Sequence, residues 1–138
     1  MISPENMVFT AVATRLRADF PGIYVAGETT VTPAKYPAVV VEERSNAVNQ
    51  TTIAQTASGT PSLENTVDLM YQVDIYSNKV SGRKSEAKAI AAVVDEVFAG
   101  MGFRRVSYTP VSNLENATVY RVAIRYEGEC DSDYMIYQ

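Results

Sequence analysis

Residues 66–103 read TVDLMYQVDIYSNKVSGRKSEAKAIAAVVDEVFAGMGF, and this stretch decides the fold because it joins a strand pattern to a helix pattern through a short polar turn. Apolar residues alternate with polar ones in its first part; the apolar set is Val67, Leu69, Tyr71, Val73 and Ile75. A period of two predicts a strand with one buried face. The polar set is Asp68, Gln72 and Asp74. We expect these polar side chains to be solvated.

The second part of the stretch predicts an amphipathic helix that packs on this strand. Its apolar residues recur at spacings of three and four, and they are Ala87, Ile90, Ala91, Val94, Val97, Phe98 and Met101. Full burial of each large side chain stabilises the fold by roughly 1.5 to 3 kcal/mol, so this face needs a docking partner. Gly102 is the natural left-handed residue to end the helix, and we expect Phe103 to fold back on Phe98.

The composition is that of an ordinary globular domain. Of its 138 residues, 46% are hydrophobic and 20% are charged, so we expect a single domain over residues 1–138. A net charge of −4 argues against direct, sequence-specific binding of nucleic acid. We also expect no signal peptide and no membrane span, with folding in a cytoplasm, because no window approaches about 18 consecutive apolar residues.

The segments on either side of the central stretch predict one more helix and several strands. A helix is expected from Ser3 and Pro4 to about residue 20, followed by strands at 23–28 and 38–44. The three consecutive valines at 39–41 predict a strand that is covered on both sides or packed in an interface.

Beyond the central stretch, strands are predicted at 104–111 and 118–129, joined by a turn at 112–117. The resulting element order is helix, two or three strands, a long strand, helix and two strands. This order predicts an α+β fold, in which a mostly antiparallel sheet of about four to six strands has two helices packed on one face.

Two segments lie outside this predicted core. Residues 45–65 are rich in Ser, Thr, Asn, Gln and Ala. A loop of about 20 residues is usually functional or disordered unless it is a hairpin whose strands extend beyond the sheet, and we favour a projecting polar hairpin or loop. Residues 131–138 form a C-terminal tail that we expect to join a sheet edge or reach a neighbouring molecule.

Candidate catalytic and metal-binding groups are few. The sequence has no His and one Cys, which excludes an internal disulfide and a thiolate–imidazole cluster for zinc or haem. Asp68 and Asp74 share a strand face but have no nucleophile and base arrangement beside them. The acidic neighbours of Cys130 raise the pKa of its thiol rather than lower it. We therefore predict no enzymatic activity, no cofactor and no metal.

Four runs of sequence carry a family resemblance. They are 71–77 (YQVDIYS), 85–95 (SEAKAIAAVVD), 102–104 (GFR) and 120–126 (YRVAIRY). Together with the opening helix and the YPAV run at 36–39, they resemble the tail terminator or tail completion proteins of long-tailed bacteriophages. The resemblance covers nearly the whole chain in element order and depends on a diffuse pattern rather than on one invariant motif.

The resemblance implies a non-enzymatic structural protein of the virion tail or neck, assembled in the host cytoplasm. It implies an α+β protomer that closes into a ring, commonly a hexamer, capping the head-proximal end of the tail tube. Its partners would be the tail tube protein and the head connector protein. Two other readings stay open: another phage neck or minor tail component, and a small soluble ligand-binding module.

The contacts with other subunits or with the tube are placed, as a hypothesis, in residues 45–65 and 131–138. A long polar hairpin and exposed tyrosines are features that a ring subunit can use, because Tyr is enriched where proteins meet. The candidate contact residues are Asn49, Thr52, Ile53, Thr56, Leu63, Tyr134, Ile136 and Tyr137.

Overall fold

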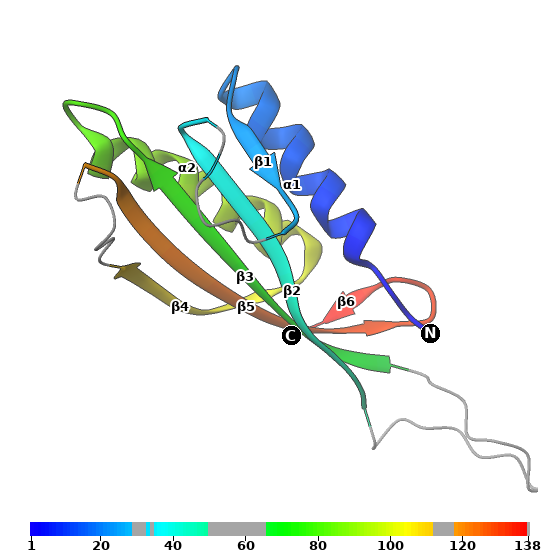
Figure 1. The fold of residues 1–138 in the computed structure, drawn as a ribbon. Helices are drawn as coiled ribbons and strands as arrows, with labels where there is room; N and C mark the ends of the chain where they lie inside the picture. The colour runs from blue at the N-terminus through cyan, green and yellow to red at the C-terminus, as the bar shows by residue number, and fades with distance from the viewer. Residues whose placement is uncertain (29–32, 34, 50–65, 112–117, 138) are drawn as a thin grey trace, which may run out of the picture.

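The computed structural model describes residues 1–28, 33, 35–49, 66–111 and 118–137 and shows two helices on one face of a sheet (Figure 1). The elements are α1 (Glu5–Asp19), β1 (Tyr24–Ala26), β2 (Ala38–Val48), β3 (Thr66–Ser77), α2 (Arg83–Met101), β4 (Arg104–Val111), β5 (Tyr120–Asp131) and β6 (Ile136–Tyr137). In this part of the chain the sheet has six strands in the order β1-β2-β3-β5-β4, with β6 added to β5. Among the described strands, only β1 and β2 pair in parallel. The predicted α+β class is confirmed.

Strand β2 is longer than the strand predicted at 38–44, and its extension lies in the segment for which a projecting hairpin or loop is expected. Strand β2 continues past Arg44 to Val48, because residues 45–48 pair with residues 67–70 of β3. Cross-strand pairing outweighs the weak strand preference of Ser and Asn in this segment. The paired ends of β2 and β3 extend away from the helices (Figure 1). The rest of the predicted polar segment, residues 50–65, lies outside the described residues.

Four aromatic side chains form the centre of the core between the sheet and α2. Phe98 of α2 stacks on Tyr126 of β5, with ring centroids 4.1 Å apart and an interplanar angle of 3°. Phe103 meets Phe98 and Tyr71 at 5.2 and 5.4 Å in edge-to-face geometry. All four are fully or almost fully buried, so they join α2 to the two central strands.

The hydroxyl groups of the two core tyrosines reach acceptors at the edge of the core. Tyr71 and Tyr126 are paired across β3 and β5. The Tyr71 hydroxyl donates to Glu43 Oε1 at 3.0 Å, and the Tyr126 hydroxyl donates to Asp95 Oδ1 at 3.0 Å. Burial raises the pKa of both phenols, so both remain hydrogen-bond donors. Each buried ring therefore has its polar atom satisfied.

The sheet face opposite the helices is partly buried as well. A second cluster lies there, made of Ala38, Val40, Tyr76 and Val119. Since neighbouring valines of β2 face the helices, the run at 39–41 is buried on both sides, as predicted. Asp74 lies on the same outer face and is only 3% exposed, and Arg121 Nη2 is 3.0 Å from its Oδ1. The prediction that Asp74 is solvated is wrong, because its charge is buried beside a counter-charge.

Helix α2 ends in the predicted glycine cap. Gly102 has a φ of 109°, and the Phe103 N–H donates to the Phe98 carbonyl at 3.0 Å. The ring of Phe103 then folds back on Phe98, as expected. The backbone of Ile136 in β6 lies directly against Gly102, where a Cβ atom would overlap the Ile136 carbonyl oxygen. The glycine is therefore needed both for the cap and for the docking of β6.

A matched pair of alanine substitutions tests this double role. Gly102→Ala should destabilise the protein by about 1 to 2 kcal/mol from the left-handed conformation alone, and further through displacement of β6. Gly100→Ala, in the last turn of the same helix, meets no atom within 4 Å and should stabilise by up to about 1 kcal/mol. Urea unfolding midpoints measure both changes. Equal midpoints for the two variants would contradict this account.

Candidate functional site

The candidate site is one end of the sheet, which we call the projecting end. It comprises residues 45–49 of the β2 side, 66–70 of β3, 127–131 of β5 and the turn and strand at 132–137. Strand register sets four side chains in one row on the outer face of these strands: Ala47, Asp68, Glu129 and Tyr137. Sequentially distant residues thus share one surface.

Two carboxylates in this row lie directly opposite each other. Asp68 of β3 pairs with Glu129 of β5, an arrangement that is normally unfavourable for like charges. The Asn49 side-chain amide donates to Asp68 Oδ1 at 3.1 Å and to Glu129 Oε1 at 3.3 Å. One neutral amide thus holds two carboxylates side by side at the surface of the projecting end.

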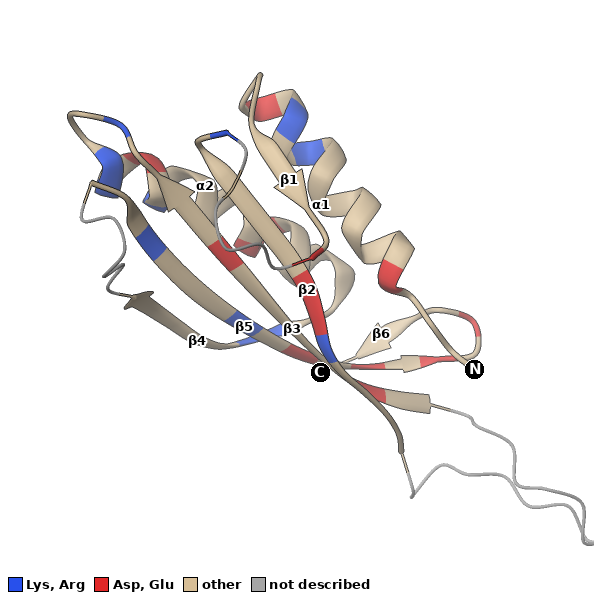
Figure 2. Cartoon of the chain, in the orientation of Figure 1, with Lys and Arg blue, Asp and Glu red and all other residues tan. Residues whose placement is uncertain are grey.

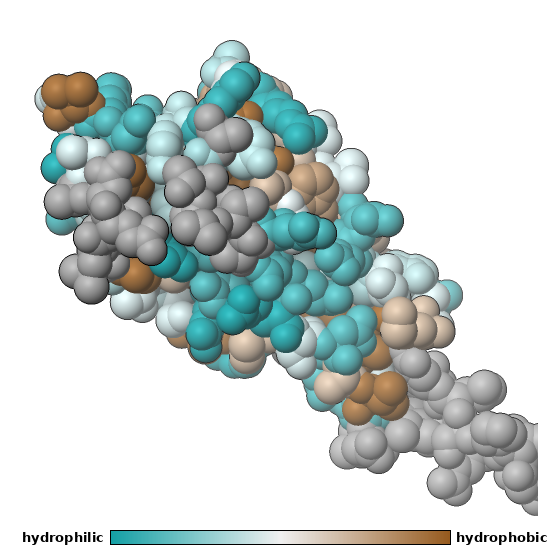
Figure 3. Space-filling model, in the orientation of Figure 1, coloured by the Kyte–Doolittle hydropathy of each residue, from teal (hydrophilic) through white to brown (hydrophobic). Residues whose placement is uncertain are grey.

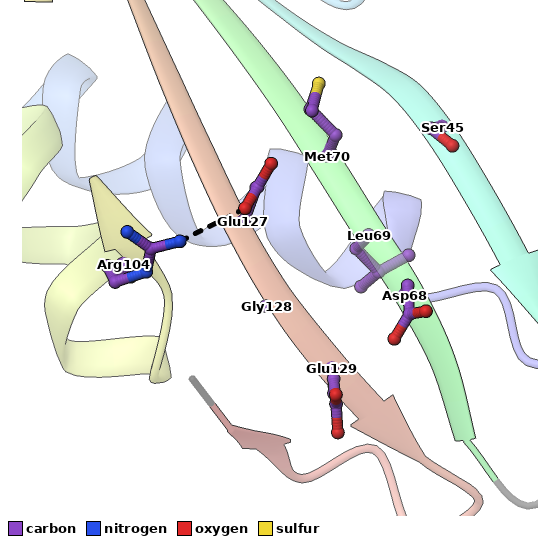
Figure 4. A pocket seen from close by; sticks show the side chains of 8 residues that line it. All are labelled: Ser45, Asp68, Leu69, Met70, Arg104, Glu127, Gly128 and Glu129. Carbon is purple, nitrogen blue, oxygen red and sulfur yellow. Dashed lines mark hydrogen bonds and ion pairs between the residues drawn. The ribbon is translucent and has the colours of Figure 1, made fainter. Parts of the chain in front are cut away.

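A shallow hollow of about 440 Å³ lies on this face (Figure 4). Its lining residues are Ser45, Asp68, Leu69, Met70, Arg104, Glu127, Gly128 and Glu129. Arg104 Nη2 is 3.2 Å from Glu127 Oε2, so this arginine already has an acidic partner. The two carboxylates bridged by Asn49 make the rest of the hollow acidic. The arrangement can bind cationic side chains or backbone N–H groups of a protein partner.

The turn between β5 and β6 is held by one aspartate. Asp131 Oδ1 accepts from the N–H of Asp133 at 3.0 Å and of Met135 at 2.9 Å, and its Oδ2 accepts from the Tyr137 hydroxyl at 3.1 Å. Tyr134 takes a positive φ of 62° in this turn. These bonds fix the turn, so its outward side chains have defined positions although they are exposed.

Apolar side chains are exposed at the same end. Met135 is 57%, Tyr137 50%, Tyr134 44% and Val48 39% exposed. Hydrophobic surface is visible in Figure 3 beside the point where the chain leaves the sheet, whereas the middle of the sheet face is mostly hydrophilic. Apolar surface beside an acidic patch is typical of a protein-binding region.

The predicted contact residues fall into three groups. Asn49, Tyr134 and Tyr137 all lie in the projecting end, where the structure brings them together. Ile136 is 9% exposed and packs in the hydrophobic core, so its side chain belongs to the protomer interior. The remaining four lie outside the described residues: Thr52, Ile53, Thr56 and Leu63.

Other members of this surface were not predicted from the sequence. Strand alternation places Asp68 on the outer face, but nothing in the local sequence shows that Glu129 lies opposite it. Met135 and Val48 are exposed apolar residues that composition alone does not separate from core residues. The strand register supplies this information.

The described residues offer little for chemistry at this end. Cys130 is buried, and burial together with the charge of Asp131 raises the pKa of its thiol. Within the part of the chain that the structure describes, no group of three or more His, Cys, Asp or Glu could hold a metal ion. No described helix combines the length and the apolar character that crossing a membrane requires.

Comparison with known proteins finds a similarity that concerns the fold. No family model matches the sequence, and no curated protein matches it. The fold is similar to that of a chain in a solved structure described as "Virion of native gene transfer agent (GTA) particle", with a TM-score of 0.51 and 17% sequence identity. The match covers 86% of this chain and 90% of that chain. At this identity the likeness concerns the arrangement of helices and strands.

Acidification should loosen the β6 turn. The pKa of Asp131 is held below its ordinary value of 3.8, mainly by the Met135 N–H and also by the Tyr137 hydroxyl and the Asp133 N–H. A lowered pKa means that the carboxylate stabilises the turn fully above 3.8 and loses this effect as the pH falls through the lower folded value. The amide chemical shift of Met135, measured by NMR, should follow this titration. An inflection above 3.8 would contradict the assignment, and Asp131→Asn should abolish the inflection.

Proposed function

We propose that the chain is a non-enzymatic structural protein of a phage-like virion, which caps the head-proximal end of the tail tube as a hexameric ring. In this role it stops growth of the tube and then offers a docking surface for the head connector. The fold likeness to a virion chain, over most of both chains, supports the broader part of the proposal. The sequence resemblance to tail terminator proteins supports the narrower part.

The projecting end is the structural feature that best supports the proposed role in the tail. A protein that closes a tube needs one region that reaches the tube and another that forms the ring, because a ring subunit has neighbours on both sides. The paired ends of β2 and β3 extend beyond the helix-covered part of the sheet (Figure 1). The end of β3 pairs with the end of β5, which leads into the β6 turn and its exposed side chains. We assign tube contacts to this end.

The same surface argues against a small-molecule site. Pockets for small ligands are concave, are lined mainly by apolar side chains and enclose most of the ligand. The hollow at the projecting end is lined in large part by charged side chains on an open sheet face. Such a surface matches another protein better than a small ligand.

Loss of the protein in cells that produce the particle provides the direct test. Without the cap, tail tubes should become longer than normal and heads should remain unjoined, as measured by electron microscopy of the lysate. Purified protein should form rings in negative stain. Tails of normal length joined to heads would reject the proposal; short or absent tails would instead indicate another neck or minor tail component.

Shortening the hairpin should separate folding from assembly. The Asn49 N–H donates to the Thr66 carbonyl at 3.0 Å, so these residues are paired closely enough for a two-residue Asn-Gly turn to replace residues 50–65. The variant should keep the circular dichroism spectrum and the unfolding midpoint of the wild type. When supplied in place of the wild type, it should yield uncapped, overlong tails. Normal tails would exclude this segment from the contact.

Two exposed apolar residues in turns at opposite ends of the sheet give a matched comparison. Met135 belongs to the projecting end, whereas Val80, 96% exposed, lies in the turn between β3 and α2. Met135→Ser and Val80→Ser should each change the free energy of unfolding by less than about 0.5 kcal/mol. Only Met135→Ser should increase the fraction of overlong tails. An effect of Val80→Ser alone would place the tube contact at the other end of the sheet.

A further inference from the structure

A groove of about 500 Å³ lies between α2 and β4, at one edge of the sheet. It is open because the α2 residues that line it include Ala91 and Ala92, whose side chains are too small to fill the space. Its charged lining residues are Lys88, Asp95 and Arg105. Arg105 Nη1 lies 3.4 Å from Asp95 Oδ1, so the acidic member already has a cationic partner. Lys88 forms no ion pair with any described residue.

The groove also contains a donor without an acceptor. The hydroxyl oxygen of Tyr108 in β4 is buried and has no hydrogen-bond partner among the described residues. Burial raises the pKa of this phenol, so the group keeps its proton. Buried polar groups are nearly always hydrogen-bonded in folded proteins. Lys88 and Tyr108 thus bring two donors to the lining of one groove, and neither forms an ion pair or side-chain hydrogen bond at that donor with a described residue.

Two carboxylates line a hollow at the opposite edge of the sheet. Glu5 at the start of α1 and Glu28 just after β1 are exposed and line a hollow of about 450 Å³ between these two elements. Neither forms an ion pair with any residue that the structure describes. Figure 2 shows acidic residues at the start of α1 and the end of β1 and basic residues at the start of β4. The strand order puts β1 and β4 at opposite edges.

We propose that these two edges join neighbouring copies of this chain, with Glu28 of one copy bound by Tyr108 and Lys88 of the next. The occupant is a second copy because the chain itself carries, on its other edge, carboxylates that form no ion pair with any described residue. The contact uses two different surfaces, so it is heterologous, and its repetition closes a ring if the rotation between subunits allows it. The inference deepens the proposed function and rests on it for the ring.

In this proposal the contact between copies is formed by side chains and not by pairing of the edge strands. Pro110 in β4 has no N–H to donate, and β1 is only three residues long. Both features discourage the addition of a strand at these edges. The pairing of Glu28 with Lys88 also favours contact between unlike edges, since it brings opposite charges together.

Two charge-reversal variants, measured singly and as a mixture, test the contact between copies. Lys88→Glu and Glu28→Lys each replace an attraction by a repulsion, and each should raise the dissociation constant of self-association by at least about tenfold. Both positions are exposed, so the protomer should fold normally. An equimolar mixture of the two variants should regain wild-type association, because each altered edge then meets an oppositely charged one. Sedimentation velocity over a concentration series at low salt measures this, with the exposed Lys79→Glu as the control.

A second variant tests the orphan hydroxyl without changing charge. Tyr108→Phe keeps the ring and removes a group that has no partner in the described part of the protomer. The unfolding midpoint should therefore stay the same or rise slightly. Self-association should weaken by about tenfold, the usual effect of losing a hydrogen bond to a charged group. If Tyr108 had only a structural role, Tyr108→Phe would lower the unfolding midpoint and leave self-association unchanged.

Three results would overturn the inference: a wild-type chain that stays monomeric at every concentration, self-association insensitive to both reversals, or a mixture no better than either variant alone. Rings that ignore the charge reversals would exclude these edges and leave the capping function intact. The opposite combination is also distinguishable. If self-association follows the charge reversals but cells that lack the protein make normal tails, the edge contact stands and the capping function is excluded.

Discussion

The stacking of Phe98 on Tyr126 is the contact on which the rest of the structure depends. Their parallel rings, 4.1 Å apart, hold α2 against β5, and Phe103 closes the group against Tyr71 of β3. The same helix end provides the Gly102 cap, and β6 docks on that glycine. One aromatic cluster therefore fixes the helix, the two central strands and the position of the C-terminal turn.

The rigid centre explains how the projecting end can tolerate unfavourable groups. Asp68 and Glu129 lie opposite each other, and Tyr134 adopts a positive φ, each at some cost in free energy. The amide of Asn49 and the carboxylate of Asp131 offset part of this cost through hydrogen bonds of 2.9 to 3.3 Å. A surface kept at such cost is consistent with selection for binding rather than for stability alone.

Much of the core could be predicted because its signals are local. The period of two in β3, the spacing of three and four in α2, and the glycine and phenylalanine after it all depend on neighbours within a few residues. Asp74 shows where this reasoning fails. The alternation of β3 predicts a solvated Asp74 side chain. Asp74 is instead buried, with Val40 paired opposite it and Arg121 as its counter-charge, and both come from other strands.

The sequence by itself determined the α+β class, the buried faces of its main strand and helix, and the cap at Gly102, because backbone periodicity and glycine conformation are properties of short segments. Only the tertiary structure decided that Glu129 faces Asp68, that β6 seals the helix end, and that Tyr108 is buried without a partner in the described residues. These features depend on strand register and on packing between remote segments, and short-range sequence patterns do not encode either one. The candidate contacts therefore became visible as surfaces only in the folded chain.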